Sequence, residues 1–147
     1  MNQSSSGAAA GLSVMHELMV RAGVPEERPV PVPATLRYDS TVPYAVCLSL
    51  GVPSTGTVDW VFARSLLLEG LRRPRGLGDV LVRPLHRGQR GSVRIVLRSP
   101  AGVALLEIAV SAVTAFLEAT HLVVAPGTEE LHIDLDRLVA ELMDGSE

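Results

Sequence analysis

The sequence predicts an α+β protein built on antiparallel strands, and three observations support this prediction. Residues 44–50 alternate between larger apolar and smaller side chains, the period-two pattern of a half-buried strand. Residues 79–83 and 92–98 are two further strand-like segments joined by a glycine-containing loop, as in a hairpin. Residues 111–122 fit a helix with one apolar stripe at positions i, i+3, i+4 and i+7, formed by Val113, Phe116, Leu117 and Thr120.

The N-terminal part is predicted to lead into a single domain. Residues 1–12 are rich in serine, glycine and alanine and are expected to be disordered, with one domain covering 13–147. Residues 13–20 fit a strand or a short helix. Residues 24–33 contain four prolines and are expected to form an extended loop.

The next segments predict a hairpin followed by a short helix. After the strand at 44–50, residues 51–56 form a turn and lead into a strand on which Val58, Trp60 and Phe62 share one face. Trp60 is expected to pack in the core because its neighbours on that face are apolar. Residues 64–71 then make about two helical turns.

Three consecutive leucines, residues 66–68, lie on this short helix. On a helix they span about 200°, so they do not all face one core. We expect the helix to be buried on two sides. The alternative is one exposed leucine at a subunit seam or a partner groove, and Leu67 is the candidate.

The C-terminal part predicts one strand and two helices. Residues 103–108 form an apolar strand, and residues 125–127 end the helix that follows. A last helix is expected to begin near Asp134, a good N-cap residue, with an apolar stripe of Leu135, Leu138, Val139 and Leu142. No internal repeat of fixed period is apparent.

Composition narrows the functional class. The 147 residues suit one domain, and 47% hydrophobic with 20% charged residues indicates a globular protein. Cys47 is the single cysteine, which excludes an internal disulfide, and it is expected to be a buried structural thiol. No apolar run approaches the ~18 residues of a membrane span, and the start lacks a secretory pattern, so we expect a cytoplasmic protein.

Charge is distributed unevenly along the chain. Residues 64–98 hold nine arginines and two carboxylates, whereas residues 99–147 hold one arginine and nine carboxylates. We expect these opposite charges to pair within the domain or between subunits. The pI near 5.8 argues against a dedicated nucleic-acid binder.

The predicted hairpin places arginines opposite each other. If its loop is centred near residue 88, residues whose numbers sum to 177 lie opposite, so Arg83 faces Arg94 and Asp79 faces Arg98. Facing like charges are unfavourable and need an anion nearby. We favour an acid of the C-terminal part or of a neighbouring subunit. An acidic partner protein is the second possibility and phosphate the third.

The densest basic run is formed by Arg72, Arg73 and Arg75. Such a run is usually a solvated turn after a helix, where cations also suit the helix dipole. A nucleic-acid contact would need interleaved aromatic side chains, and the chain has five in all. We therefore regard this run, with Arg83, Arg94 and Arg98, as candidate partner-binding residues.

The sequence contains no strong catalytic pattern. Glu130, His132 and Asp134 would share a face of an extended segment and could ligate a metal, but we favour a solvated edge leading into the last helix. Residues 76–78 form a G-x-G that precedes a strand, whereas a phosphate-binding loop opens a helix. No G-x-S-x-G motif is present. We predict no catalytic, metal-binding or cofactor-binding residues.

Several motifs together resemble the SsgA-like sporulation and cell-division family of actinobacteria. The main ones are residues 32–39, 43–46 and 58–71, and the resemblance extends over roughly residues 13–143. The further matching segments are Arg73-Pro74, residues 76–80, Ser99-Pro100, residues 105–107, Phe116-Leu117, residues 126–129 and residues 134–136.

The resemblance implies both a fold and a function. It decides for a strand at residues 13–20 and implies a barrel-like antiparallel sheet with flanking helices, similar to the Whirly-type fold, in a homotrimer. It implies a non-catalytic adaptor at the septum that recruits the tubulin-like GTPase FtsZ or contacts an SsgA-like paralogue. The rival function is a single-stranded nucleic-acid binder with a Whirly-like fold, and an enzyme is a distant third. Extra arginines between residues 83 and 98 depart from the family pattern.

Overall fold

Eight antiparallel strands form one sheet in the computed structural model, which describes residues 11–87, 90–133 and 142. The α+β class is therefore confirmed. The first half comprises β1 (Ser13–Gly23), β2 (Val30–Asp39), β3 (Ala45–Val52), β4 (Gly56–Ala63) and α1 (Arg64–Gly70). The second half comprises β5 (Arg75–Leu77), β6 (Val80–Arg87), β7 (Arg90–Ser99), β8 (Gly102–Ala109) and α2 (Val110–Val123).

The sheet consists of two meanders joined in the middle. The strand order is β4-β3-β2-β1-β8-β7-β6-β5, so β1 pairs with β8 and the edges are β4 and β5. Each meander of four strands is followed by a helix, which gives a repeated ββββα pattern. The sequence did not reveal this repeat because the two halves share topology without a fixed residue period.

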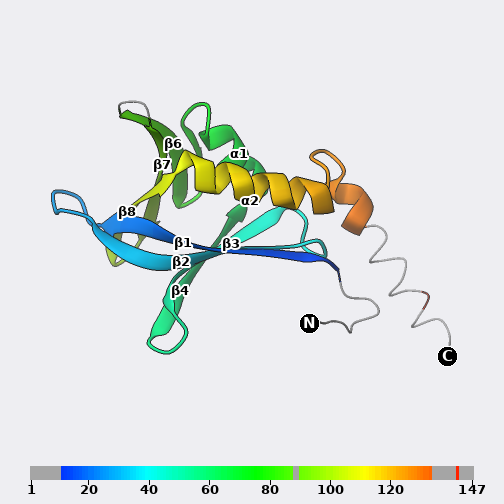
Figure 1. Cartoon of the computed structure of the whole chain (residues 1–147), viewed down its shortest axis with the longest axis horizontal. Helices are drawn as coiled ribbons and strands as arrows, with labels where there is room; N and C mark the ends of the chain where they lie inside the picture. Colours follow the sequence, from blue (N-terminus) through cyan, green and yellow to red (C-terminus); the bar gives the residue numbers. More distant parts are fainter. Residues whose placement is uncertain (1–10, 88–89, 134–141, 143–147) are drawn as a thin grey trace.

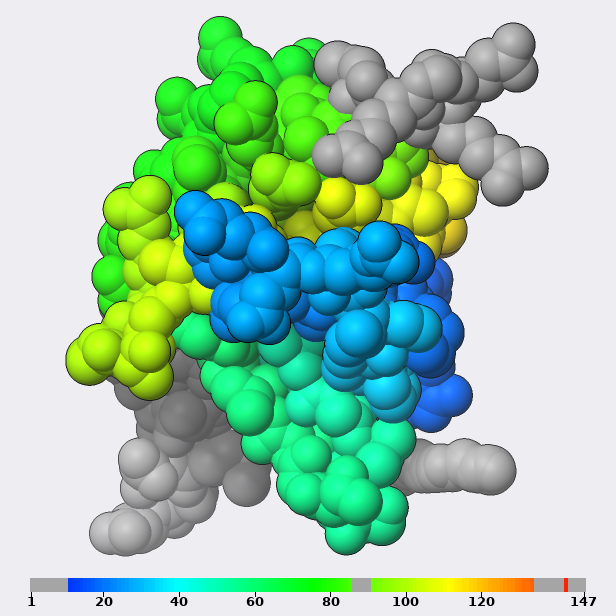
Figure 2. All heavy atoms as spheres, turned by 90° about the vertical axis from the view of Figure 1, so that its left-hand side faces the viewer, coloured from blue at the N-terminus to red at the C-terminus, as the bar shows by residue number. Residues whose placement is uncertain are grey.

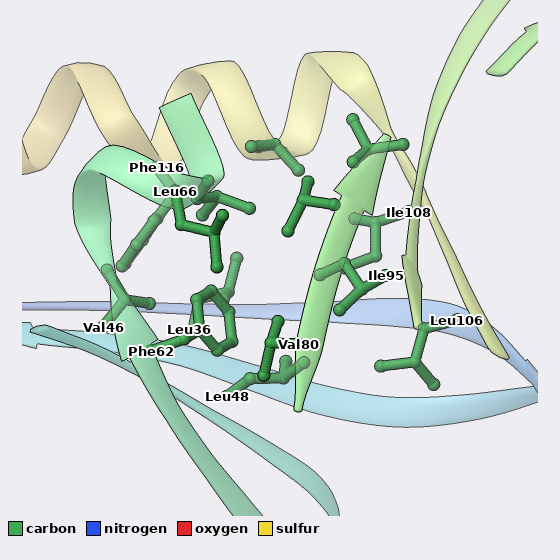
Figure 3. Close-up of a cluster of buried hydrophobic side chains, with 14 of the residues drawn as sticks. Leu36, Val46, Leu48, Phe62, Leu66, Val80, Ile95, Leu106, Ile108 and Phe116 are labelled. Atoms are coloured by element: carbon green, nitrogen blue, oxygen red, sulfur yellow. The ribbon is translucent and has the colours of Figure 1, made fainter. Parts of the chain in front are cut away.

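The sheet curls around α2, and both helices lie on its concave face (Figure 1). Between them lies a core built from alternate residues of the strands and one face of each helix (Figure 3). The helix side of β1 carries Val20 and His16, and the His16 ring packs edge-on against Phe116 with centroids 5.5 Å apart. The other face of the sheet, called the outer face below, points away from both helices.

Four predictions about these elements are confirmed. Residues 13–20 form a strand, and Val113, Phe116, Leu117 and Thr120 are the buried face of α2. The hairpin has the expected register, with Arg83 opposite Arg94. Trp60 packs against the core with part of its ring exposed.

The leucines of α1 are buried on two sides, as expected. Leu66 and Leu67 are in the core, and Leu68 packs against it from the side. Leu67 has 0% exposure, so the alternative of an exposed Leu67 is wrong for this chain. The short helix sits between the β5–β6 edge and the rest of the core, which covers more than one of its faces.

The proline-rich segment differs from its prediction. Residues 24–29 form the loop, but β2 already begins at Val30 and includes Pro31 and Pro33. Both prolines pair with β1, whereas the ladder with β3 begins only at Ala34. Proline is tolerated at both positions because β2 forms no ladder with β3 there, so no N–H donor is lost on the side that faces β3.

Two further expectations need correction. Cys47 is half-buried on the outer face and not enclosed in the core. The last helical segment begins at Glu129 and not near Asp134. The predicted apolar stripe lies outside the described residues except for Leu142, as does the N-terminal segment before Gly11. Within the described ranges, no helix is long and apolar enough to span a membrane.

Candidate partner-binding surface

The register of four strands places a row of charged side chains across the outer face. Arg83 on β6 lies opposite Arg94 on β7, which in turn lies opposite Glu107 on β8. Glu107 is also opposite Arg21 on β1. We call Arg83, Arg94, Glu107 and Arg21 the charged row. It brings together arginines from the basic middle of the chain and one acid from the C-terminal part.

An ion pair inside this row supplies the anion that the sequence required. The Nη2 atom of Arg94 lies 3.2 Å from Oε2 of Glu107, and both side chains are partly buried. The favoured interpretation, pairing with an acid of the C-terminal part, is therefore confirmed for Arg94. Because Glu107 sits in the middle of the row, it lowers the repulsion between its cationic neighbours.

An apolar row runs beside the charged row. Leu81, Val96 and Leu105 are opposite one another on β6, β7 and β8 and point to the same outer face. Beyond them lies Arg98, which is exposed and opposite Asp79. On β7 the outer face therefore reads Arg94, Val96 and Arg98 at alternate positions.

A hollow of about 310 Å³ adjoins the charged row at the β1–β2 turn. It is bounded by Arg21, Arg94 and Glu107 and by the turn residues Glu26 and Glu27. In Figure 2 this turn (blue) lies beside the yellow-green segment that includes β8. The hollow thus has carboxylates as well as arginines in its wall, and the unbalanced positive charge lies on the β6–β7 side.

The second basic run lies elsewhere. Arg72, Arg73 and Arg75 are exposed and follow α1, on the helix side of the sheet edge. The Nε atom of Arg75 is 2.6 Å from Oε1 of Glu69 on α1, with both side chains about half exposed. The structure therefore does not bring this run together with Arg83, Arg94 and Arg98.

A buried arginine that the sequence analysis did not single out connects distant parts of the fold. Arg64 is 2% exposed and its Nη2 atom lies 2.6 Å from Oε2 of Glu129. Its Nη1 atom donates to the carbonyl oxygen of Thr120 at 3.3 Å, in the last turn of α2, and to that of Val124 at 2.8 Å, the residue that follows α2. The guanidinium also stacks 4.9 Å above the ring of Tyr38.

This cluster explains two of the family-like motifs. Arg64 lies within the motif at residues 58–71 and Glu129 ends the motif at residues 126–129, so both are fold determinants. A lone arginine between the apolar runs Trp60–Ala63 and Leu66–Leu68 was the available signal. Sequence alone did not show which of the C-terminal acids it would meet.

The Glu129 carboxyl is held in its charged form. Burial is the largest single effect on this carboxyl and by itself would raise its pKa, but the hydrogen bond from Arg64 and the smaller effects that act with it together outweigh burial. Backbone N–H donors, including that of Gly127 at 3.0 Å, and the charge of Arg64 act in the same direction. The pKa of Glu129 therefore lies below its usual value.

A second outer-face feature, also missed by the sequence analysis, covers β1 to β4. Met15, Arg37, Cys47 and Val61 form one row across these strands. They line a groove of about 370 Å³ in which Met15 and Val61 are mostly exposed. Arg37 donates hydrogen bonds to Cys47 Sγ at 3.3 Å and Ser49 Oγ at 3.0 Å.

The possible metal-binding set is not assembled as its spacing suggested. Glu130 and His132 lie on a helical segment, where residues two apart point in different directions. Asp134 lies outside the described residues. In the part of the chain that the structure describes, no group of three or more His, Cys, Asp or Glu side chains could hold a metal ion.

Fold and surface together define an α+β module whose outer sheet face carries charged and apolar rows. A family model described as "Streptomyces sporulation and cell division protein, SsgA" matches residues 32–129. The chain belongs to this SsgA family, which consists of cell-division proteins and not of enzymes.

Two of its relatives match along nearly their whole length. The sporulation-specific cell division protein SsgB of Streptomyces coelicolor is 47% identical over 131 residues, 89% of this chain and 96% of that protein. SsgB of Frankia casuarinae is 44% identical over 133 residues, 90% of this chain and 93% of that protein.

Two solved structures share the fold. One comes from work reporting that mutations in SsgB correlate to longitudinal cell division during sporulation of Streptomyces coelicolor. It has a TM-score of 0.79, 48% identity, and coverage of 86% of this chain and 99% of that one. The other is the SsgA-like sporulation-specific cell division protein of Thermobifida fusca. It has a TM-score of 0.84, 36% identity, and coverage of 92% and 98%. The predicted family membership and its sheet-and-helix fold are confirmed.

Proposed function

We propose that the chain is a non-catalytic adaptor that positions the sporulation septum by recruiting or tethering the FtsZ division machinery. One observation carries this proposal: 47% identity to SsgB of Streptomyces coelicolor over 89% of this chain and 96% of that protein. A protein of this kind acts through its surface. The charged and apolar rows of the outer face are surfaces that a partner can contact.

We further propose that it acts as a homotrimer in the cytoplasm, at the division septum. Exposed apolar side chains lie on two segments that contact Arg64. Val42 and Tyr44 are in the β2–β3 loop, whose Tyr44 carbonyl accepts a hydrogen bond from the Arg64 backbone, and Leu131 follows the Arg64 partner Glu129 beyond α2. Assembly would remove such side chains from water. Three copies of one weak patch would then bind a polymer tightly through multivalency.

The test combines a size measurement with binding to the polymer. The purified chain is subjected to light scattering, and is then sedimented with GTP-assembled FtsZ from the source organism. We expect a trimer mass and co-sedimentation that requires GTP. A paralogue of the SsgA-like family is assayed alongside as a competing partner. The proposal would be contradicted if the chain were a monomer and stayed in the supernatant while the FtsZ polymers sedimented.

Single-stranded nucleic-acid binding is the rival function, and the positive charge of residues 64–98 favours it. Stacking on aromatic side chains usually provides such binding. Here Tyr38, Phe62 and Phe116 are buried and Trp60 packs against the core, so Tyr44 is the one mostly exposed ring of the five. Titration of labelled oligothymidylate at low and physiological salt separates the two functions. Micromolar binding that falls steeply with salt would support the rival.

A further inference from the structure

We propose that the outer face of β6 and β7 binds an extended acidic segment of the division-machinery partner. The segment carries acidic residues at positions i and i+4 and an apolar residue at i+2. The identity of the partner rests on the function proposed above, but the chemistry of the segment is derived from this surface alone.

The cations of this face have the spacing of an extended chain. Arg94, Val96 and Arg98 occupy alternate positions of β7 and point outward, with Arg83 opposite Arg94. At ~3.3 Å per residue, the two arginines of β7 are about 13 Å apart. A partner strand has the same rise, so its side chains i and i+4 reach both positions.

The positive charge on this face is only partly neutralised. Arg94 is paired with Glu107, whereas Arg83 and Arg98 are exposed and have no ion-pair partner among the described residues. Asp79 is opposite Arg98, which makes that end less positive than the Arg83 end. We therefore assign the stronger carboxylate contact to Arg83 and the weaker one to Arg98.

An apolar contact lies between the two cations. Leu81 and Val96 face each other across β6 and β7, midway between the Arg83 and Arg98 positions. Val96 is only 9% exposed, so its neighbours already shield it and form a shallow apolar floor. An apolar side chain at i+2 of the partner would rest on this floor, and this contact sets the register of the flanking acids.

The surface fits a protein segment better than a nucleic acid. Residues 79–109 contain no Trp, Tyr or Phe, so β6 to β8 offer no platform on which bases could stack. The adjoining hollow has Glu26, Glu27 and Glu107 in its wall, and these carboxylates would repel a phosphate backbone. A short acidic segment places its charges over the arginines without meeting these acids.

Charge reversal with a matched control tests the proposal. The variant R83E/R98E changes the net charge by the same amount as the control R72E/R73E, whose residues lie after α1 and away from this face. All four side chains are exposed, so both variants are expected to melt like the wild type. Binding to FtsZ is measured at low and physiological salt. A second probe is a bead-displayed Asp-Gly-Leu-Gly-Asp peptide beside its Asn-Gly-Leu-Gly-Asn counterpart.

The expected result is at least about tenfold weaker binding of both probes by R83E/R98E, with the control within about twofold of wild type. Wild type is also expected to prefer the Asp peptide, more strongly at low salt. Equal losses in both variants, or no preference for the Asp peptide, would overturn the proposal. The proposal would also be overturned if R83E/R98E lost binding to oligothymidylate but still bound FtsZ as wild type does. If FtsZ fails to bind wild type while the Asp peptide shows the expected pattern, the surface stands and the proposed function fails.

Discussion

Removal of the Glu129 carboxylate tests whether the buried Arg64 cluster holds the two halves of the fold together. The Glu129→Leu variant leaves a guanidinium that is 2% exposed without its anion. Breaking a buried ion pair from one side typically costs 3–5 kcal/mol, a large part of the ~5–15 kcal/mol total for a small domain. We expect a loss of about 3 kcal/mol. Glu129→Gln is expected to cost about 2 kcal/mol because its amide oxygen still accepts a hydrogen bond.

The double variant Arg64→Met/Glu129→Leu distinguishes the pair from ordinary packing. It removes the buried charge altogether, and its main remaining cost is the Val124 carbonyl, which loses its 2.8 Å donor. An unsatisfied buried carbonyl costs about 1–3 kcal/mol. The double variant is therefore expected to be more stable than the sum of the two single losses by at least about 2 kcal/mol.

Urea unfolding at pH 7, followed by the fluorescence of the single tryptophan, Trp60, measures these differences. All variants are compared at one protein concentration, since assembly makes apparent stability depend on concentration. A loss below about 1 kcal/mol for Glu129→Leu, or additive losses in the double variant, would refute the reasoning.

The same pair predicts a pH dependence. Because the pKa of Glu129 is lowered in the folded state, its contribution is complete above the unfolded value of about 4.3. That contribution is lost as the pH falls through the folded pKa. Wild type is therefore expected to lose more stability than Glu129→Gln on acidification from about pH 5. Parallel profiles for the two proteins would contradict this.

Three other perturbations follow from the packing. Burial and then the charge of Arg64 lower the pKa of His121, so stability should decline as pH drops below about 6.5, and His121→Gln should flatten that decline in a melting series. Gly70→Ala would place a Cβ 2.2 Å from a Val82 methyl and should cost about 1–3 kcal/mol in urea unfolding, with partial recovery when Val82→Ala is added. Phe116→Ala should cost about 3–5 kcal/mol because the ring is fully buried, whereas Leu122→Ala, at 90% exposure, should stay within about 0.5 kcal/mol; similar effects of the two would disprove the assigned helix face.

Local pattern was enough to predict most of the elements. The alternation at residues 44–50 and the stripe of α2 are short-range features, because the side-chain period of a strand or helix depends only on neighbouring residues. The hairpin register was also predictable, since a short loop fixes which residues of two adjacent strands pair. Arg83 therefore faces Arg94, as counting from the loop suggested.

Long-range contacts were decided only by the tertiary structure. The opposed arginines required an anion, but Glu107 was one of nine C-terminal acids, and only the pairing of β7 with β8 selected it. Arg64 likewise met Glu129 because α2 returns across the concave face, 65 residues later in the chain.

The sequence by itself thus determined the strands, the helix faces and the family, because these depend on local periodicity and on ordered motifs. The tertiary structure alone decided that β1 pairs with β8, which closes two meanders into one sheet. It also separated Arg72, Arg73 and Arg75 from the outer-face arginines and buried Leu67. Chain order does not encode such proximity, because the curl of the sheet and the packing of the helices set which distant residues meet.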